Sequence, residues 1–327
     1  MKRNSSIDVL KFICAFCVVT IHSGFGGNVV IEPFLRCAVP IFFMISGYFI
    51  YNKIVRNDVG RIIIDARRIL KILLISAAAY TPPLLADHYL LGIDFGTSYK
   101  TIVNTIFFND TYPVAPHLWY LSAYIYVLVI VALTVKSQKW LKLQHLSFAL
   151  YTFVILMLYI WFFFKGKGIN PVYYRNFLFE GLPFFCTGAL ISQYKSKLPK
   201  IHKRHLYIVT VILVFLSYIE FKALANNGIK TDIYFFTLPL SMTVVIASLK
   251  TKVSSNNILA YLGREYSLPL YIVHLFIAKH IVYLFINDKM LVEYYYYVSP
   301  MVVTLVSLGL IYAYRSIKRA LAKENKV

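Results

Sequence analysis

The sequence predicts an all-α, polytopic membrane protein with about ten transmembrane helices and both termini in the cytoplasm. Of its 327 residues, 59% are hydrophobic and only 15% are charged, whereas soluble domains average about 25% charged residues. Apolar stretches long enough to span a bilayer recur along the whole chain. They fall at 7–25, 34–52, 72–91, 118–135, 146–164, 178–194, 206–222, 233–249, 267–286 and 298–314.

Lys and Arg residues concentrate in alternate connections between these stretches. The connections that include both termini hold 24 of the 34 Lys and Arg residues, and the other set holds seven. The positive-inside rule places the richer set in the cytoplasm, together with a short basic tail at 315–327. Topology therefore explains most of the net charge of +20, and we expect no nucleic-acid binding.

The first span carries ionisable side chains, which are costly inside a membrane and usually mark a functional site. Lys11 and His22 are eleven residues apart, so they share one helix face and lie about 16 Å apart along the axis. Asp8 lies one turn from Lys11 and points within roughly 40° of His22. This face is the first candidate for a functional site.

The N-terminus also has features of a signal peptide, because Lys2 and Arg3 precede an apolar run. Lys11 interrupts that run, and residues 24–26 make a poor cleavage site. We therefore expect an uncleaved first span.

Further polar residues gather at the outer level where several predicted spans begin or end. With His22 they are Arg36, His117, Arg175 and Glu180, and Trp119 directly follows His117 and Leu118. Snorkelling of side chains to the interface accounts for Arg175 and His117. For His22 and Arg36, which apolar sequence flanks, the pattern favours a site.

The ninth span places Tyr271 and His274 one turn apart, near its inner third. A His at this depth usually faces protein or water rather than lipid. A structural hydrogen bond and a catalytic role both remain open for these two residues.

The connection at 53–71 carries six basic residues, which are Lys53, Arg56, Arg61, Arg67, Arg68 and Lys71. Its charge alone favours a role in topology and lipid-headgroup contact. The alternative is a phosphate-binding patch for a cytosolic, nucleotide-bearing donor, and Arg61, Arg67, Arg68 and Lys71 are the candidates for it.

Several segments together resemble the acyltransferase-3 family of bacterial integral-membrane enzymes. The most specific is 36–48, Arg-Cys-Ala-Val-Pro-Ile-Phe-Phe-Met-Ile-Ser-Gly-Tyr, which is similar to the family's second-span signature. The first span matches the family pattern of Asp, a basic residue and a His eleven positions later. Weaker matches follow in order at 117–119, 181–188 and 271–274, so a single domain of this type covers 1–327.

The resemblance implies transfer of an acyl group, with acetyl the first choice, from cytosolic acyl-CoA to a hydroxyl of a surface glycan or lipid-linked sugar. The expected partners are thus acyl-CoA, the glycan or lipid-linked acceptor and membrane lipids, in a bacterial plasma membrane. No metal is expected. The basic inner side and the outer polar cluster fit a donor that reaches along the face of Asp8, Lys11 and His22.

Under this hypothesis His22 is a general base on the acceptor hydroxyl or a transient acyl carrier, since its ordinary pKa of about 6.5 suits both roles. Arg36 stabilises the oxyanion that forms on the thioester carbonyl. Lys11 neutralises donor charge or holds Asp8. The family usually has Arg at this position, and Lys lacks its bidentate fork. His117, Trp119, Glu180, Tyr271 and His274 are supporting residues.

Two other classes of protein fit the same spans. A transporter or flippase for a small anion or a lipid-linked sugar also uses intramembrane His, Lys and Asp. It is favoured by broken helices or an inverted repeat, of which the sequence gives no convincing sign. A membrane-embedded sensor is the third possibility, and an appended recognition domain is its expected mark.

Overall fold

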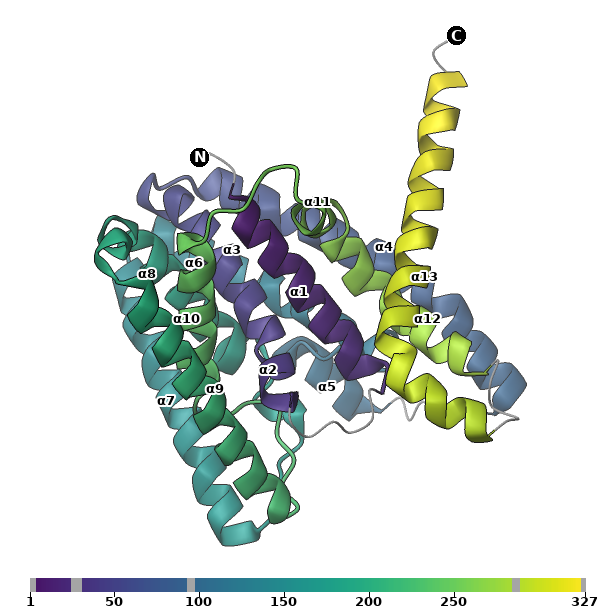
Figure 1. The fold of residues 1–327 in the computed structure, drawn as a ribbon, viewed down its shortest axis with the longest axis horizontal. Coiled ribbons are helices and arrows are strands. Elements are labelled where there is room, and N and C mark those ends of the chain that lie inside the picture. Colours follow the sequence, from purple (N-terminus) through teal and green to yellow (C-terminus); the bar gives the residue numbers. More distant parts are fainter. Residues whose placement is uncertain (1–3, 25–30, 93–97, 284–288, 325–327) are drawn as a thin grey trace. The chain divides into compact units, whose positions relative to one another are not determined.

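The computed structural model describes residues 4–24, 31–92, 98–283 and 289–324, and every regular element in these ranges is a helix (Figure 1). Within these ranges, seven helical segments are long and apolar enough to cross a membrane. They are Ser5–His22, Glu32–Val55, Val59–Leu90, Pro116–Lys136, Trp140–Lys165, Lys203–Asn226 and Tyr294–Ala322. The predicted all-helical class is confirmed.

Three shorter apolar helices, at Phe177–Gln193, Thr237–Lys250 and Ser267–Lys279, coincide with the remaining predicted spans. They have 10–17 residues each, and a perpendicular crossing of the hydrocarbon core takes about 20. The count of ten spans and the cytoplasmic position of the termini therefore stay predictions.

The chain divides into two compact units, Met1–Ala38 with Thr251–Val327, and Val39–Lys250. The helices of the first unit are α1 (Ser5–His22), α2 (Glu32–Arg36), α11 (Ile258–Glu265), α12 (Ser267–Tyr283) and α13 (Lys289–Glu324). The second unit starts within α3 (Ala38–Val55) and continues with α4 (Val59–Leu91), α5 (Tyr99–Phe108), η1 (Pro116–Leu118), α6 (Trp119–Lys136), α7 (Trp140–Lys165), η2 (Pro171–Tyr173), η3 (Phe177–Gly181), α8 (Leu182–Gln193), η4 (Lys195–Lys200), α9 (Lys203–Asn226) and α10 (Thr237–Lys250).

Helix also occurs in stretches that the sequence predicted as connections or tail. Most of the basic connection at 53–71 belongs to α4, which begins at Val59 because the Asp58 side chain accepts a hydrogen bond from the Arg61 N–H and caps the helix. The long connection at 92–116 contains α5, and α13 continues through the basic tail to Glu324. Hydropathy alone missed these extensions because each one is polar or amphipathic.

A close backbone approach fixes α1 against α11 in the first unit. A Cβ atom on Gly263 would lie 1.7 Å from the Asp8 carbonyl oxygen, so only glycine allows this crossing. The Asn4 side chain caps α1 by accepting from the Ser6 and Ile7 N–H groups, and the Ser6 hydroxyl donates to the Thr251 carbonyl. The start of α1 is therefore fixed from two sides.

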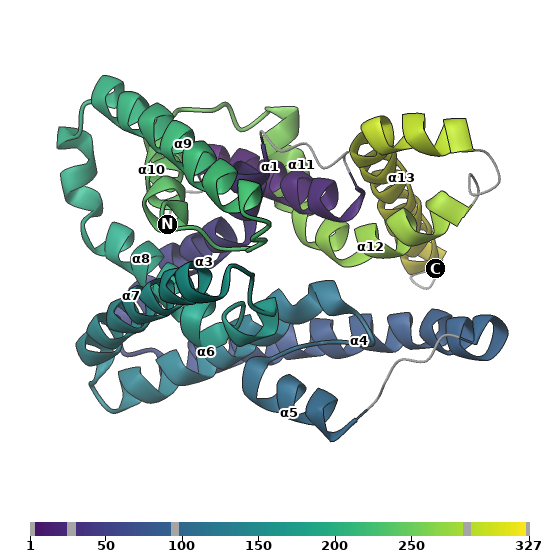
Figure 2. The same ribbon diagram turned by 90° about the horizontal axis from the view of Figure 1, so that it is seen from below.

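The second unit repeats this device between α3 and α8. A Cβ on Gly47 would lie 1.9 Å from the Phe185 carbonyl oxygen, and one on Gly188 would lie 1.8 Å from the Met44 carbonyl oxygen. Small residues at helix contacts are typical of membrane proteins, where close packing replaces the hydrophobic drive. Nearby, α4 packs along α6, and its C-terminal half extends past α6 in Figure 2.

We predict that Gly188→Ala lowers stability, because the new methyl group forces α3 and α8 apart. Overpacking of this kind costs about 1–3 kcal/mol. Gly309→Ala is the matched control, since a Cβ on that helical glycine meets no atom within 4 Å. Thermal unfolding of both variants in detergent measures the difference, and equal melting temperatures would contradict the close packing.

Candidate functional site

The first turns of α1 hold a buried carboxylate and its partner. Asp8 is 4% exposed, and the Lys11 ammonium nitrogen lies 3.2 Å from its Oδ1 atom. The two residues are one turn apart, as the sequence predicts, and the half-buried Lys11 supplies the charge that a buried carboxylate requires. The Lys11 ammonium group is therefore paired with the Asp8 carboxylate.

His22, the last residue of α1, is exposed and contacts a second histidine. Its ring centroid lies 5.3 Å from that of His274 on α12, with the two planes tilted by 42°. His274 itself is fully buried. The sequence placed His274 near the inner third of its span and His22 at the outer end, and this expected separation is wrong.

The separation fails because α11 and α12 both pack on α1. The eight residues of α11 cover the start of α1, where Gly263 meets Asp8. The next helix, α12, also packs on α1, and its His274 meets His22 at the end of α1.

Backbone carbonyl groups fix the protonation pattern of His274. Its Nδ1 atom lies 2.7 Å from the Tyr271 carbonyl oxygen and 3.3 Å from the Leu270 carbonyl oxygen. Because a carbonyl oxygen only accepts, Nδ1 carries the proton, and Nε2 is the acceptor in the neutral ring. The Tyr271 ring lies 6.1 Å from the His274 ring. The structure thus brings His22, Tyr271 and His274 together.

Arg36 ends the short helix α2, which packs on α1. Its Nε and Nη2 atoms each lie 2.7 Å from Oε1 of Glu32, one turn earlier. An oxyanion would have to share this guanidinium with Glu32. The sequence gave Glu32 no role, although its i, i+4 spacing to Arg36 is the signal for such a pair.

Trp119 and Arg175 are linked in the second unit. The guanidinium carbon of Arg175 lies 5.4 Å from the Trp119 ring centroid, and its Nη1 atom lies 2.8 Å from Oδ2 of Asp232. Burial raises the pKa of the neighbouring Tyr174 phenol to about 12, so the phenol stays neutral while its oxygen accepts from the Asp232 N–H at 3.0 Å. Arg175 is therefore held by protein contacts, and its snorkelling to the interface stays a prediction.

His117 is 2% exposed and lies in η1, just before α6. Its ring lies 5.1 Å from that of Tyr80 on α4 in an edge-on arrangement. A side chain that snorkels to the interface is exposed to water. Because His117 is buried, the snorkelling interpretation is wrong for this residue. Its burial against α4 is a contact between residues 37 positions apart, which no local pattern reveals.

Asn109 ties the start of α6 to the start of η3, and the sequence analysis missed it. The side chain is fully buried, donates to the Trp119 carbonyl at 3.3 Å and accepts from the Phe177 N–H at 2.7 Å. Its backbone is left-handed, with φ of 51°. The Asn-Asp pair after an apolar helix is a turn signal that could have indicated it.

Glu180 lies in a π-helical turn, Phe177–Gly181, and is 5% exposed. The Asn176 side chain caps this turn by accepting from the Leu178 and Phe179 N–H groups. Turns of this type occur frequently at functional sites. A single polar residue in an apolar span predicts neither the turn nor its cap.

The basic side chains proposed for a donor lie on one side of α4. Arg61, Arg67, Arg68 and Lys71 are all exposed, whereas Ile62 and Ala66 on the opposite arc are buried. Arg61 also lies 3.2 Å from the Asp58 carboxylate. An exposed basic stripe suits both lipid phosphates and a soluble phosphate-bearing donor.

The predicted outer residues fall into both units. His22 and Arg36 belong to the first unit, and His117, Trp119 and Glu180 belong to the second. Their gathering into one site therefore stays a prediction.

These features define a helical membrane protein with ionisable groups packed inside its first span. Residues 4–314 match the acyltransferase-3 family, described as an acyltransferase domain. The chain belongs to this family. The resemblance that the second-span signature indicated is thereby confirmed, and the match covers nearly the whole chain.

The chain is also similar to a protein whose name does not describe an acyltransferase. Over 223 residues the chain is 28% identical to a protein named serine/alanine racemase from Enterococcus gallinarum. The match covers 60% of this chain but only 30% of the racemase. No solved structure matches the chain.

We predict that Asn109→Ala destabilises the second unit, because it leaves the half-buried Phe177 N–H without its acceptor. An unsatisfied buried donor costs about 1–3 kcal/mol. Asn256→Ala, at an exposed asparagine, is the control. The measurement is thermal unfolding in detergent, and an Asn109→Ala variant as stable as the control would disprove this bridging role.

Proposed function

We propose that the protein transfers an acyl group from acyl-CoA, acetyl-CoA foremost, to a hydroxyl of a surface glycan or lipid-linked sugar at the outer face of the plasma membrane. Family membership supports acyl transfer in general. The observation that carries the specific proposal is the exposed His22 imidazole in contact with the buried, tautomer-fixed His274. A general base needs this combination of access and fixed orientation.

In the proposed reaction, the acceptor hydroxyl gives its proton to His22 while its oxygen attacks the thioester carbonyl carbon. Arg36, shared with Glu32, stabilises the negative charge that develops on the carbonyl oxygen. The C–S bond then breaks, and the CoA thiolate leaves and takes up the proton from His22. A transient acyl group on His22 is the alternative course, with the hydroxyl attacking in a second step.

The donor is proposed to approach from the basic cytoplasmic side. Arg61, Arg67, Arg68 and Lys71 would contact its phosphates, since exposed cations on one helix stripe attract a polyanion. Lys11 holds Asp8 in this scheme. His117, Trp119, Glu180 and Tyr271 would support the acceptor region.

A second candidate function is transport of a small anion or a lipid-linked sugar. It is favoured by the ionisable groups of α1, Asp8, Lys11 and His22, because transporters also place such groups in membrane helices. Purified protein in vesicles with radiolabelled acyl-CoA and candidate acceptors separates the two functions. Labelled acceptor supports transferase activity, and movement of intact solute without labelling supports transport.

We predict that His22→Ala lowers the rate of acyl transfer by about 10²–10⁴-fold, the usual contribution of a general base. His145→Ala on α7 is the matched control, since His145 is also exposed but lies in the second unit. Initial rates with labelled acyl-CoA give the comparison. Unchanged transfer by His22→Ala would end its catalytic assignment.

We predict that His274 acts as a positioning residue for His22. His274→Leu should lower kcat by roughly 10- to 100-fold, the equivalent of a lost hydrogen bond to a charged group, with little change in KM. The pH profile of kcat should also shift, which a purely structural role would not cause. His274→Asn keeps a donor toward the Tyr271 carbonyl and should recover part of the rate. If His274→Leu lowered the yield of folded protein but left the kcat of the folded fraction unchanged, the positioning role would be refuted.

A further inference from the structure

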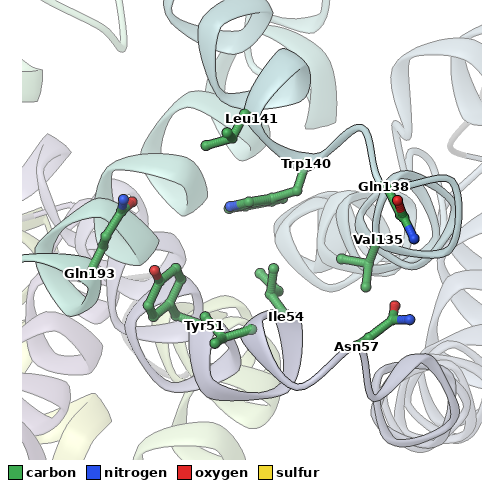
Figure 3. Close-up of a pocket in the computed structure, with 9 residues that line it drawn as sticks. Tyr51, Ile54, Asn57, Val135, Gln138, Trp140, Leu141 and Gln193 are labelled. Atoms are coloured by element: carbon green, nitrogen blue, oxygen red, sulfur yellow. The ribbon is translucent and has the colours of Figure 1, made fainter.

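A cavity of about 290 Å³ lies in the second unit, where α3 and α6 end and α7 begins (Figure 3). Its polar lining consists of Tyr51, Asn57, Gln138, Trp140 and Gln193. Ligand pockets span about 300–1,000 Å³, so this cavity suits a small, compact group. We call it the Trp140 cavity.

The walls of the Trp140 cavity combine flat aromatic faces with side-chain amides. Figure 3 shows the indole of Trp140 in the middle, with its nitrogen pointing to the side where Tyr51 and Gln193 lie. This indole nitrogen is buried and has no hydrogen-bond partner within the described part of the chain. Amides both donate and accept, and aromatic rings stack on flat bases. The lining therefore fits a planar heterocycle with ring nitrogens.

The backbone around the cavity is unusual as well. Asn57 and Gln138 are left-handed, with φ of 52° and 57°, and they are two of the three described non-glycine residues in that conformation. Such conformations cost free energy, more for Gln than for Asn, and cluster at functional sites. They place the two amides at the ends of α3 and α6.

Basic residues directly adjoin the lining residues in sequence. Arg56 precedes Asn57, while Lys136 and Lys139 flank the stretch that holds Gln138, and all three cations are exposed. Because these cations are sequence neighbours of the lining residues, a phosphate attached to the bound heterocycle would find positive charge nearby. Amides, an unpaired indole N–H and neighbouring cations favour a polar, anionic occupant over a plain lipid chain.

We infer that the Trp140 cavity binds the adenine base of the acyl-CoA donor, stacked on Trp140, with Arg56, Lys136 and Lys139 toward its phosphates. The inference rests on the proposed acyl-CoA donor, and it adds these three cations to the stripe on α4 that is proposed to contact the same phosphates. Figure 3 shows the Gln193 amide on one side of Trp140 and the Asn57 and Gln138 amides on the other, so polar groups are available on both sides of the base. The thioester end then extends away from the cavity toward the acceptor.

Titration calorimetry of the full chain in detergent with adenosine 3′,5′-bisphosphate, the nucleotide portion of CoA, tests this site without any acyl transfer. Trp140→Ala should weaken the Kd roughly tenfold, as loss of one base stack does. Trp140→Phe keeps a stacking ring and should bind nearly as the wild type does. Trp161→Ala, elsewhere on α7, is the matched control and should leave the Kd unchanged.

The outcomes separate this inference from the proposed function. Wild-type protein that does not bind the nucleotide, or Trp140→Ala that binds it as tightly as wild type, overturns the cavity assignment even if acyl transfer proceeds. Trp140-dependent binding with no acyl transfer supports the cavity and refutes the transferase. If Trp140→Ala does not fold, Tyr51→Leu takes its place in the comparison, with the same weakening expected and an unchanged Kd overturning the assignment.

Discussion

Close backbone approach between helices is the constraint on which the packing of this protein depends. In a membrane, apolar side chains gain nothing by leaving lipid for protein, so helices associate through tight contacts and shared polar groups. Gly263 gives α1 and α11 such a contact, and Gly47 with Gly188 gives α3 and α8 another. The contact at Gly263 involves the backbone of Asp8 itself, so the burial of that carboxylate and the closeness of the two helices are one feature.

The contacts of the buried polar side chains depend on the same constraint. A polar side chain away from water needs a partner within the protein, and the structure supplies partners from distant segments. Asn109 joins the starts of α6 and η3, and Arg175 joins Trp119 to Asp232. These links fix the ends of the helices, where the sequence changes from apolar to polar. The starts of α6 and η3, which carry Trp119 and Glu180, are therefore held by protein contacts.

The sequence predicted the helical class, the first span and the one-turn spacing of Asp8 and Lys11, because hydropathy and helix periodicity are local properties. It could not predict the contact between His22 and His274, which are 252 positions apart, since that depends on how α12 packs on α1. The early start of α4 was missed because Asp58 caps a helix whose first turns are polar. The Trp140 cavity was missed because Tyr51 and Trp140 belong to different helices and neither stands out alone.

Lys11 and His22 lie toward opposite ends of α1 and have different surroundings. Lys11 is engaged with a buried carboxylate at 3.2 Å, and removing either partner would leave a charge without its counterion. His22 is exposed at the other end, and its neighbouring ring has a proton position set by the backbone. A residue that moves a proton needs access and a defined orientation, and the exposed His22 ring lies against this fixed neighbour. An Arg at position 11 could hold Asp8 and still bind a second anion with its fork, whereas Lys11 has a single ammonium group and serves mainly the carboxylate. In the proposed reaction His22 therefore carries out the proton transfer, and basic residues outside α1 contact the donor phosphates.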